Sequence, residues 1–106
     1  MDNPAITQKT SLETLKLLGD FWTLRIIDAL KDGELRYCGV QRQAGGINPV
    51  TLSSRLKKLE QAGIIRRQDC AQDKISVSYR LTELGRGTLP VLNAINQFSD
   101  KLRPAV

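Results

Sequence analysis

The chain has 106 residues, of which 41% are apolar and 25% are charged, and its formal net charge is +5. This length suits one folding unit with a modest core, and the composition excludes the highly charged, weakly apolar pattern of a disordered chain. No apolar run approaches the ~20 residues that span a bilayer, and residues 1–11 lack the apolar segment of a secretory signal. We therefore expect a cytoplasmic protein without a membrane partner.

The positive charge is concentrated in the middle of the chain. Residues 34–80 hold nine lysines and arginines against four acidic residues, which accounts for the whole net charge. The remaining residues carry seven charges of each sign. A polyanion would therefore be attracted to one region of the molecule rather than to the surface at large.

The residue types needed for metal binding or catalysis are scarce. The chain contains no histidine, and its two cysteines, Cys38 and Cys70, are too far apart for a Cys-x-x-Cys motif. It has no glycine-rich phosphate loop after a strand and no pair of carboxylates spaced for acid–base work. We expect no metal, no cofactor, no disulfide framework and no enzymatic activity.

Two helices are predicted in the first third of the chain. Residues 1–10 are polar and aperiodic, which predicts a frayed arm. Thr10 and Glu13 have the spacing of a capping box, which opens a helix that the next glycine ends. Asp20 is a suitable N-cap for a second helix over residues 21–31.

Residues 36–62 have the pattern of a helix-turn-helix. Apolar residues at helical spacing predict a short helix over residues 36–44, and a glycine pair forms the turn that follows. Asn48 is suited to the N-cap of a longer helix over residues 49–62, because a proline comes directly after it at the first helical position. Two helices joined by a tight turn are typical of a DNA-binding motif.

Residues 64–81 change to the period of two that is typical of strands. Ile64 and Ile65 open a strand, residues 71–74 form a polar turn, and residues 75–81 alternate between apolar and polar. The segment therefore predicts a β-hairpin.

A last helical region is predicted over residues 83–102, with Thr82 as its cap. Pro90 lies inside it and predicts a kink or a division into two helices. The order of elements predicts an α+β fold, mainly α, in which residues 1–106 form a single winged helix-turn-helix domain. Its helix-turn-helix occupies residues 36–62, and its wing of two or three strands occupies residues 64–81.

The outer face of the 49–62 helix is the part of the sequence that best indicates a function. Its leucines are predicted to face the core, which leaves small, hydroxyl-bearing and basic side chains outside, and its single acid, Glu60, lies near the C-terminal end. Such a face suits a major groove, where hydroxyl and guanidinium groups reach base edges and lysines meet phosphates. The candidate DNA-binding residues are Arg36, Asn48, Pro49, Val50, Thr51, Ser53, Ser54, Arg55, Lys57, Lys58, Arg66 and Lys74.

These candidates divide into two expected roles. Thr51, Ser54 and Arg55 are the best candidates for contacts to base edges. The residues expected to meet mainly phosphates are Arg36, Lys57, Lys58 and Lys74. Two alternatives stay open: the face is merely solvated, or the winged helix docks on another protein without binding DNA. A docking face would be expected to display aromatic or large apolar anchors.

Three segments together resemble the HxlR-type regulators of the MarR-like winged-helix superfamily. They are "LKLLGDFWTLRIIDAL", "INPVTLSSRLKKLEQAGIIRR" and "YRLTELGRGTLPVL", and the resemblance runs from about Leu12 to Phe98. It implies a homodimer, joined mainly by the first and last helices, that reads successive major grooves of a near-palindromic operator in duplex DNA. The implied dimerisation residues, which also fit a simple core stripe, are Leu12, Leu15, Leu89, Leu92, Ile95 and Phe98.

The chain departs from this family at one position. Many HxlR-type members carry a cysteine just before the first helix, and some sense oxidants or electrophiles through it, whereas the matching residue of this chain is Lys9.

Cys38 offers a different thiol switch, because a helix N-terminus and the adjacent Arg36 would favour its thiolate. The simpler interpretation of Cys38 is a small, partly buried thiol. The sequence indicates no particular small-molecule effector.

Overall fold

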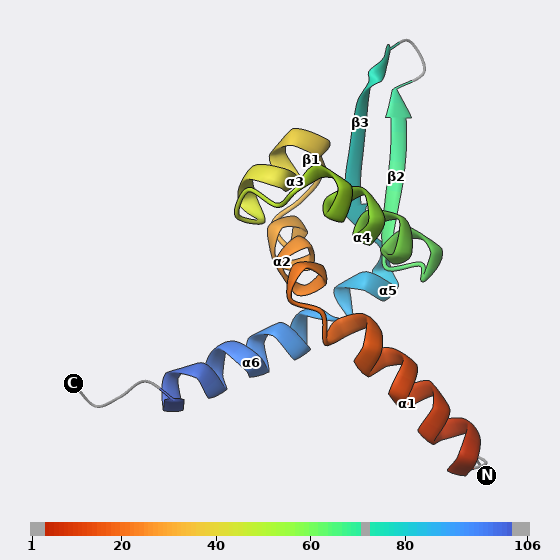
Figure 1. Ribbon diagram of the computed structural model, residues 1–106, viewed down its shortest axis with the longest axis vertical. Helices are drawn as coiled ribbons and strands as arrows, with labels where there is room; N and C mark the ends of the chain where they lie inside the picture. The colour runs from red at the N-terminus through yellow and green to blue at the C-terminus, as the bar shows by residue number, and fades with distance from the viewer. Residues whose placement is uncertain (1–3, 71–72, 103–106) are drawn as a thin grey trace.

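The computed structural model describes residues 4–70 and 73–102, with side chains described for residues 11–69 and 77–102. Figure 1 shows a central body from which α1 and α6 project as two arms, while the hairpin of β2 and β3 projects on another side. The elements in chain order are α1 (Pro4–Leu18), α2 (Phe21–Leu30), β1 (Leu35–Arg36), α3 (Tyr37–Gln43), α4 (Pro49–Gln61), β2 (Ile65–Cys70), β3 (Asp73–Leu81), α5 (Glu83–Arg86) and α6 (Leu89–Leu102).

The three strands form one antiparallel sheet in the order β1-β3-β2. Leu35 of β1 pairs with Tyr79, and Ile65 of β2 pairs with Leu81. The predicted hairpin is therefore confirmed, and β1 makes it the three-stranded form of the wing. The predicted turn over residues 71–74 is wrong for residues 73 and 74, because β3 begins at Asp73, and residues 71–72 lie outside the described residues. Helices and this small sheet together confirm the predicted α+β, mainly α, fold class.

The core lies where α2, α3 and α4 meet the sheet. Ile26 and Leu30 of α2, Val40 of α3 and Leu52 of α4 have no exposed side-chain surface. They form one cluster with Ile65 and other residues of the hairpin base. Burial of this apolar surface fixes the helix-turn-helix against the wing, since it is the main favourable term in folding.

Three of the four predicted caps are confirmed by hydrogen bonds, whereas the predicted cap at Thr10 is wrong, because Thr10 lies inside α1. The Asp20 carboxylate accepts from the backbone N–H of Thr23 at 2.9 Å, and the Asn48 side-chain oxygen accepts from the N–H of Val50 at 2.8 Å. The Thr82 hydroxyl accepts from the N–H of Gly85 at 3.0 Å. Each cap satisfies a donor that its helix leaves unpaired, so these local signals set where the helices begin.

One predicted element boundary is wrong and another is confirmed. The predicted arm over residues 1–10 is wrong for its described part, because α1 begins at Pro4. Proline suits a first helical turn, and neither glycine nor proline interrupts the chain again before Gly19. The predicted break at Pro90 is confirmed as a division: α5 ends at Arg86, and Pro90 is the second residue of α6.

No helix of the described residues is both long enough and apolar enough to cross a membrane.

Candidate nucleic-acid interface

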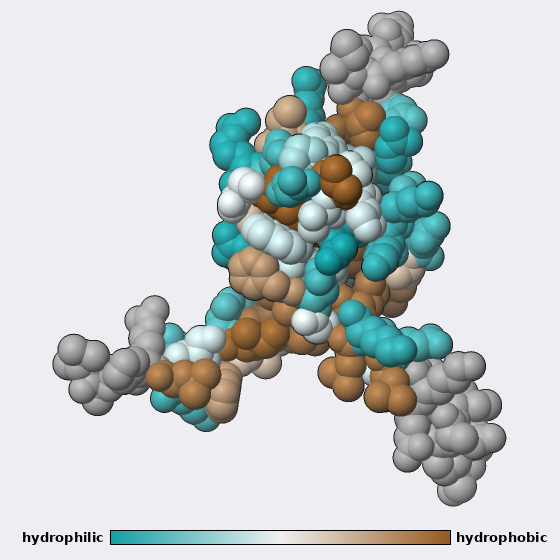
Figure 2. Space-filling view, viewed as in Figure 1, coloured by the Kyte–Doolittle hydropathy of each residue, from teal (hydrophilic) through white to brown (hydrophobic). Residues whose placement is uncertain are grey.

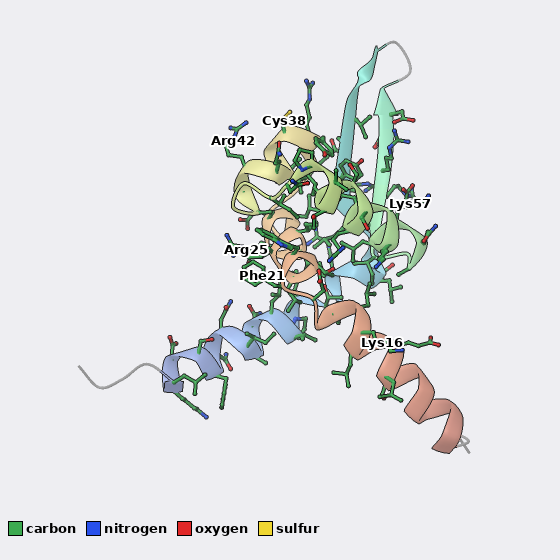
Figure 3. The ribbon with its side chains drawn as sticks, in the orientation of Figure 1. Lys16, Phe21, Arg25, Cys38, Arg42 and Lys57 are labelled. Carbon is green, nitrogen blue, oxygen red and sulfur yellow. The ribbon has the colours of Figure 1, made fainter. Side chains whose placement is uncertain are left out.

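Helix α4 has one face in the core and one face free. Leu52, Leu56 and Leu59 are buried, as predicted. On the opposite side, Ser54 and Lys57 are exposed, as are the neighbouring Asn48, Pro49, Val50, Ser53 and Lys58. Figure 3 shows Lys57 extending away from the body. The structure thus leaves most of the predicted contact residues of α4 accessible, while Thr51 is half-buried.

Hydrogen bonds to backbone carbonyls hold the start of α4 against α3. The Tyr37 hydroxyl donates to the Pro49 carbonyl at 3.2 Å and lies 3.2 Å from the Ser53 hydroxyl. The Gln41 side-chain amide donates to the Ile47 carbonyl at 3.0 Å. Because these bonds join the two helices and their turn, the exposed end of α4 is rigidly placed before any partner arrives.

Arg25 of α2 extends this support to the turn. Its Nε donates to the Ala44 carbonyl at 3.1 Å, and its guanidinium lies 5.9 Å from the centre of the Phe21 ring. Figure 3 shows Arg25 and Phe21 side by side. Sequence reasoning missed Arg25, Tyr37 and Gln41 as supports of the turn, because each reaches a carbonyl that only the folded chain brings near.

Arg55 does not lie free on the outer face of α4. Its Nε donates to Asp20 Oδ2 at 2.8 Å and its Nη2 donates to Asp20 Oδ1 at 3.2 Å, so the contact is bidentate. The side chains of Arg55 and Asp20 are only 26% and 29% exposed. Two of its five N–H donors are therefore engaged within the protomer, and its role as a base-edge contact stays a prediction.

The electrostatics of Asp20 follow from this pairing. The hydrogen bond from Arg55 is the main cause that lowers the pKa of Asp20 from 3.8 to about 2. Partial burial opposes this shift, whereas the Thr23 backbone N–H and hydroxyl support it. The pKa of Arg55 is raised by the same bond. Both groups stay charged throughout the neutral range.

The wing places its predicted contacts differently. Ile65 and Leu81 point into the core, and their neighbours Arg66 and Arg80 pair across the strands, so these arginines lie on the other face of the sheet. They line a pocket of about 470 Å³ together with Arg86. Arg66 therefore lies on the sheet face that points away from the core, and its contact with DNA stays a prediction. The predicted Lys74 lies in β3, but its side chain is outside the described residues.

Two predicted residues lie near the start of α3. Arg36 is exposed and forms the N-cap position without a side-chain cap bond. Cys38 is an exposed free thiol, so the interpretation of a partly buried thiol is wrong. Figure 3 shows Cys38 and Arg42 on the same side of the molecule. The redox role of Cys38 stays a prediction.

The arms carry most of the exposed large apolar side chains. Leu15 of α1 and Phe98 of α6 are 66% and 57% exposed, and Leu12 and Ile95 are also exposed. Figure 2 shows apolar surface along both arms. Leu92, by contrast, is only 8% exposed and belongs to the core of the protomer. Its prediction as a dimer contact is corrected, since the first turns of α6 pack against α2.

The HxlR-like helix-turn-helix family matches residues 17–105, which cover α2 to α6 and the end of α1. The chain belongs to this family. The match includes the whole helix-turn-helix and wing, so the resemblance that the three sequence segments indicated is confirmed. The relatives that match are named HTH-type transcriptional regulators, which supports the expectation that the chain is not an enzyme.

Individual relatives and solved structures are similar to the chain in the same way. The chain is 37% identical over 89 residues to an uncharacterized HTH-type transcriptional regulator, BH0655, of Halalkalibacterium halodurans, covering 83% of this chain and 79% of that one. The reduced form of the transcriptional regulator YodB of Bacillus subtilis has a TM-score of 0.73 and 32% identity, over 95% of this chain and 94% of YodB. A protein of Porphyromonas gingivalis assigned to MarR-family regulators has a TM-score of 0.77 and 28% identity, over 93% of each chain.

Proposed function

We propose that this member of the HxlR-like family is a sequence-specific transcription regulator that binds duplex DNA as a homodimer. The observation that carries the proposal is the two-sided character of α4. Three leucines hold one face in the core, while the free face bears hydroxyl groups and lysines and has no acid before Glu60. Such a helix fits a major groove, because phosphates attract its lysines and short side chains let the backbone approach the bases.

The proposed contacts follow the exposure of the side chains. Ser54, with Thr51 and Ser53, would hydrogen-bond to base edges, and exposed Val50 would pack on a thymine methyl group. The N-terminal end of α4, at Asn48 and Pro49, would face the DNA backbone. The proposed phosphate contacts are Arg36, Lys57, Lys58 and Lys74. Arg55 is left out because it is paired with Asp20, and Arg66 is left out because it lies on the sheet face that points away from the core.

The proposed dimer uses the two arms. Leu12 and Leu15 on α1 and Ile95 and Phe98 on α6 expose apolar surface that a second copy would cover. Leu89 is half-buried against the core, so it would contribute at the edge. Two copies related by a two-fold axis would present two α4 helices, and a near-palindromic operator with half-sites ~34 Å apart would match them.

The proposal is tested by selecting bound sequences from a random duplex pool and then measuring affinity as salt is raised. We expect a near-palindromic sequence to be enriched. Lys57→Ala should weaken binding to all sequences alike and reduce the slope of log affinity against log salt by about 1, as for one lost phosphate contact. Ser54→Ala should instead relax the preference at one base pair and cost about 1 kcal/mol.

Lys101→Ala is the matched control, because Lys101 is exposed near the end of α6, far from α4. It should leave both the affinity and the salt slope unchanged. If the wild-type protein shows no retention on duplex DNA at low salt, the proposal fails and the protein-docking alternative takes its place.

A further inference from the structure

One ion pair joins parts of the chain that are 35 residues apart. Asp20 lies at the corner between α1 and α2, and Arg55 lies in the middle of α4. Both hydrogen bonds between them, at 2.8 and 3.2 Å, run from the guanidinium to the two carboxylate oxygens. A bidentate contact of this kind fixes direction as well as distance, because the planar guanidinium must lie edge-on to the carboxylate.

The position of the Asp20 carboxylate is itself fixed. Its Oδ2 accepts from the backbone N–H of Thr23 at 2.9 Å and from the Thr23 hydroxyl at 3.0 Å. These bonds cap α2, so moving the carboxylate would break that cap and destabilise the start of the helix. Arg55 is therefore held relative to the N-terminus of α2.

Arg55 is well placed to set the rotation of α4 about its axis. It lies on the flank between the buried stripe, which includes Leu56 and Leu59, and the exposed face that bears Ser54. Apolar packing tolerates small sliding movements better than a charged bidentate bond does. The leucines therefore hold α4 against the core, and the ion pair sets the direction in which its exposed face points.

The surroundings make the carboxylate necessary for this arrangement. Asp20 and Arg55 line a small hollow of about 80 Å³ with Lys16, Thr23 and Lys58. Asp20 is the acid among these lining residues, and the other charged ones are cations. Removing its charge would leave Arg55 among lysines, so like-charge repulsion would move its side chain and the α4 backbone that bears it.

We propose that Asp20 and Arg55 form a positioning pair, in which Arg55 acts on DNA recognition by orienting α4 and not by touching a base. The inference rests on the proposed function of α4. Because one residue, Gly19, separates Asp20 from α1, the pair also links the arm that carries Leu12 and Leu15 to the recognition helix.

The test is a double-mutant cycle on the full-length protein with its selected operator, followed by fluorescence anisotropy. Asp20→Asn keeps an N-cap acceptor for α2 but removes the charge, and Arg55→Gln removes the other partner. We expect each variant to bind the operator about tenfold more weakly. The double variant should bind no more weakly than either single variant, because both remove the same pair.

The matched control is Asp28→Asn, which makes the same charge change on α2. It removes the acid of the exposed Asp28–Lys31 pair, whose atoms lie 3.2 Å apart. Its operator affinity should stay within about twofold of the wild type. The proposal is overturned if Arg55→Gln weakens binding while Asp20→Asn leaves it unchanged or strengthens it, since Arg55 would then be a base or phosphate contact.

A second readout without DNA separates this inference from the proposed function. Amide chemical shifts of α4 should move in Asp20→Asn, which leaves the α4 sequence unchanged, but not in Asp28→Asn, at a temperature where each variant is folded. Unmoved α4 amides would overturn the positioning pair whatever the DNA results are. If the α4 amide shifts move but the protein does not bind DNA, the positioning pair is supported and only the proposed DNA-binding function is rejected.

Discussion

The carboxylate of Asp20 accepts four hydrogen bonds, two from Thr23 and two from Arg55. The hydrogen bond from Arg55, with those from Thr23, lowers its pKa to about 2 against the opposing effect of partial burial. An acid whose pKa is lowered by folding stabilises the folded state above its unfolded pKa of 3.8. This contribution is lost as the pH falls from about 4 to about 2, where the carboxylate becomes protonated in the folded state as well.

The free energy of unfolding of Asp20→Asn should therefore converge on that of the wild type in acid. At pH 7 we expect the variant to be less stable by about 2 kcal/mol, the equivalent of the pKa shift, and near pH 2 the difference should almost vanish. Urea unfolding at intervals between pH 7 and pH 2 measures this directly. A difference that stays constant down to pH 2 would show that lost packing, and not lost charge, causes the destabilisation.

Helix starts and turns were predictable from the sequence, because their causes are local. Asp20, Asn48 and Thr82 each cap a helix within three residues of themselves, so residue type and spacing suffice. The division at Pro90 is equally local, since proline lacks the N–H that a continuing helix needs. The start of α1 at Pro4 was missed because a polar, aperiodic segment gives no apolar stripe to reveal it.

The site was only partly predictable, because long-range contacts decide which side chains stay free. Periodicity placed Ser54 and Lys57 outside the core correctly, but it gives no sign that Arg55 finds an acid 35 residues away. Leu92 fits a dimer stripe as well as a core stripe, and its burial follows from the packing of α6 against α2. Arg66 differs: its alternation with buried Ile65 already indicated the opposite face of the sheet.

Helix α5 is packed so closely on Ile64, the residue just before β2, that only glycine fits at one position. A Cβ atom on Gly85 would overlap the carbonyl oxygen of Ile64, which is backbone and cannot rotate away. We expect Gly85→Ala to cost about 1–3 kcal/mol of unfolding free energy. Gly39→Ala in α3 is the control, because its Cβ would make ordinary contacts with Leu35, and it should be neutral or stabilising. Equal losses in chemical denaturation would contradict this account.

At the scale of the whole molecule, the outer turns of the two arms, α1 and α6, extend away from the rest of the protomer and so have little to pack against. They leave the body in different directions, and the apolar side chains of their outer turns stay exposed (Figures 1 and 2). A pocket of about 550 Å³, lined by Leu17 of α1 and Val91 of α6, continues this apolar surface at their base. Isolated protomers would keep this surface in water, which is unfavourable in proportion to its area.

The combined variant Leu15→Ser and Phe98→Ser should therefore convert the proposed dimer to a monomer in analytical ultracentrifugation. Full burial of each side chain is worth about 1.5–3 kcal/mol, and each substitution acts twice in a symmetric dimer. Affinity for an operator with both half-sites should fall far more than affinity for a single half-site, because the second contact is no longer tethered to the first. Asn96→Ser, an exposed polar change on α6, should alter neither measurement. If the Leu15 and Phe98 variant sediments as the wild type does, the arms do not form the interface.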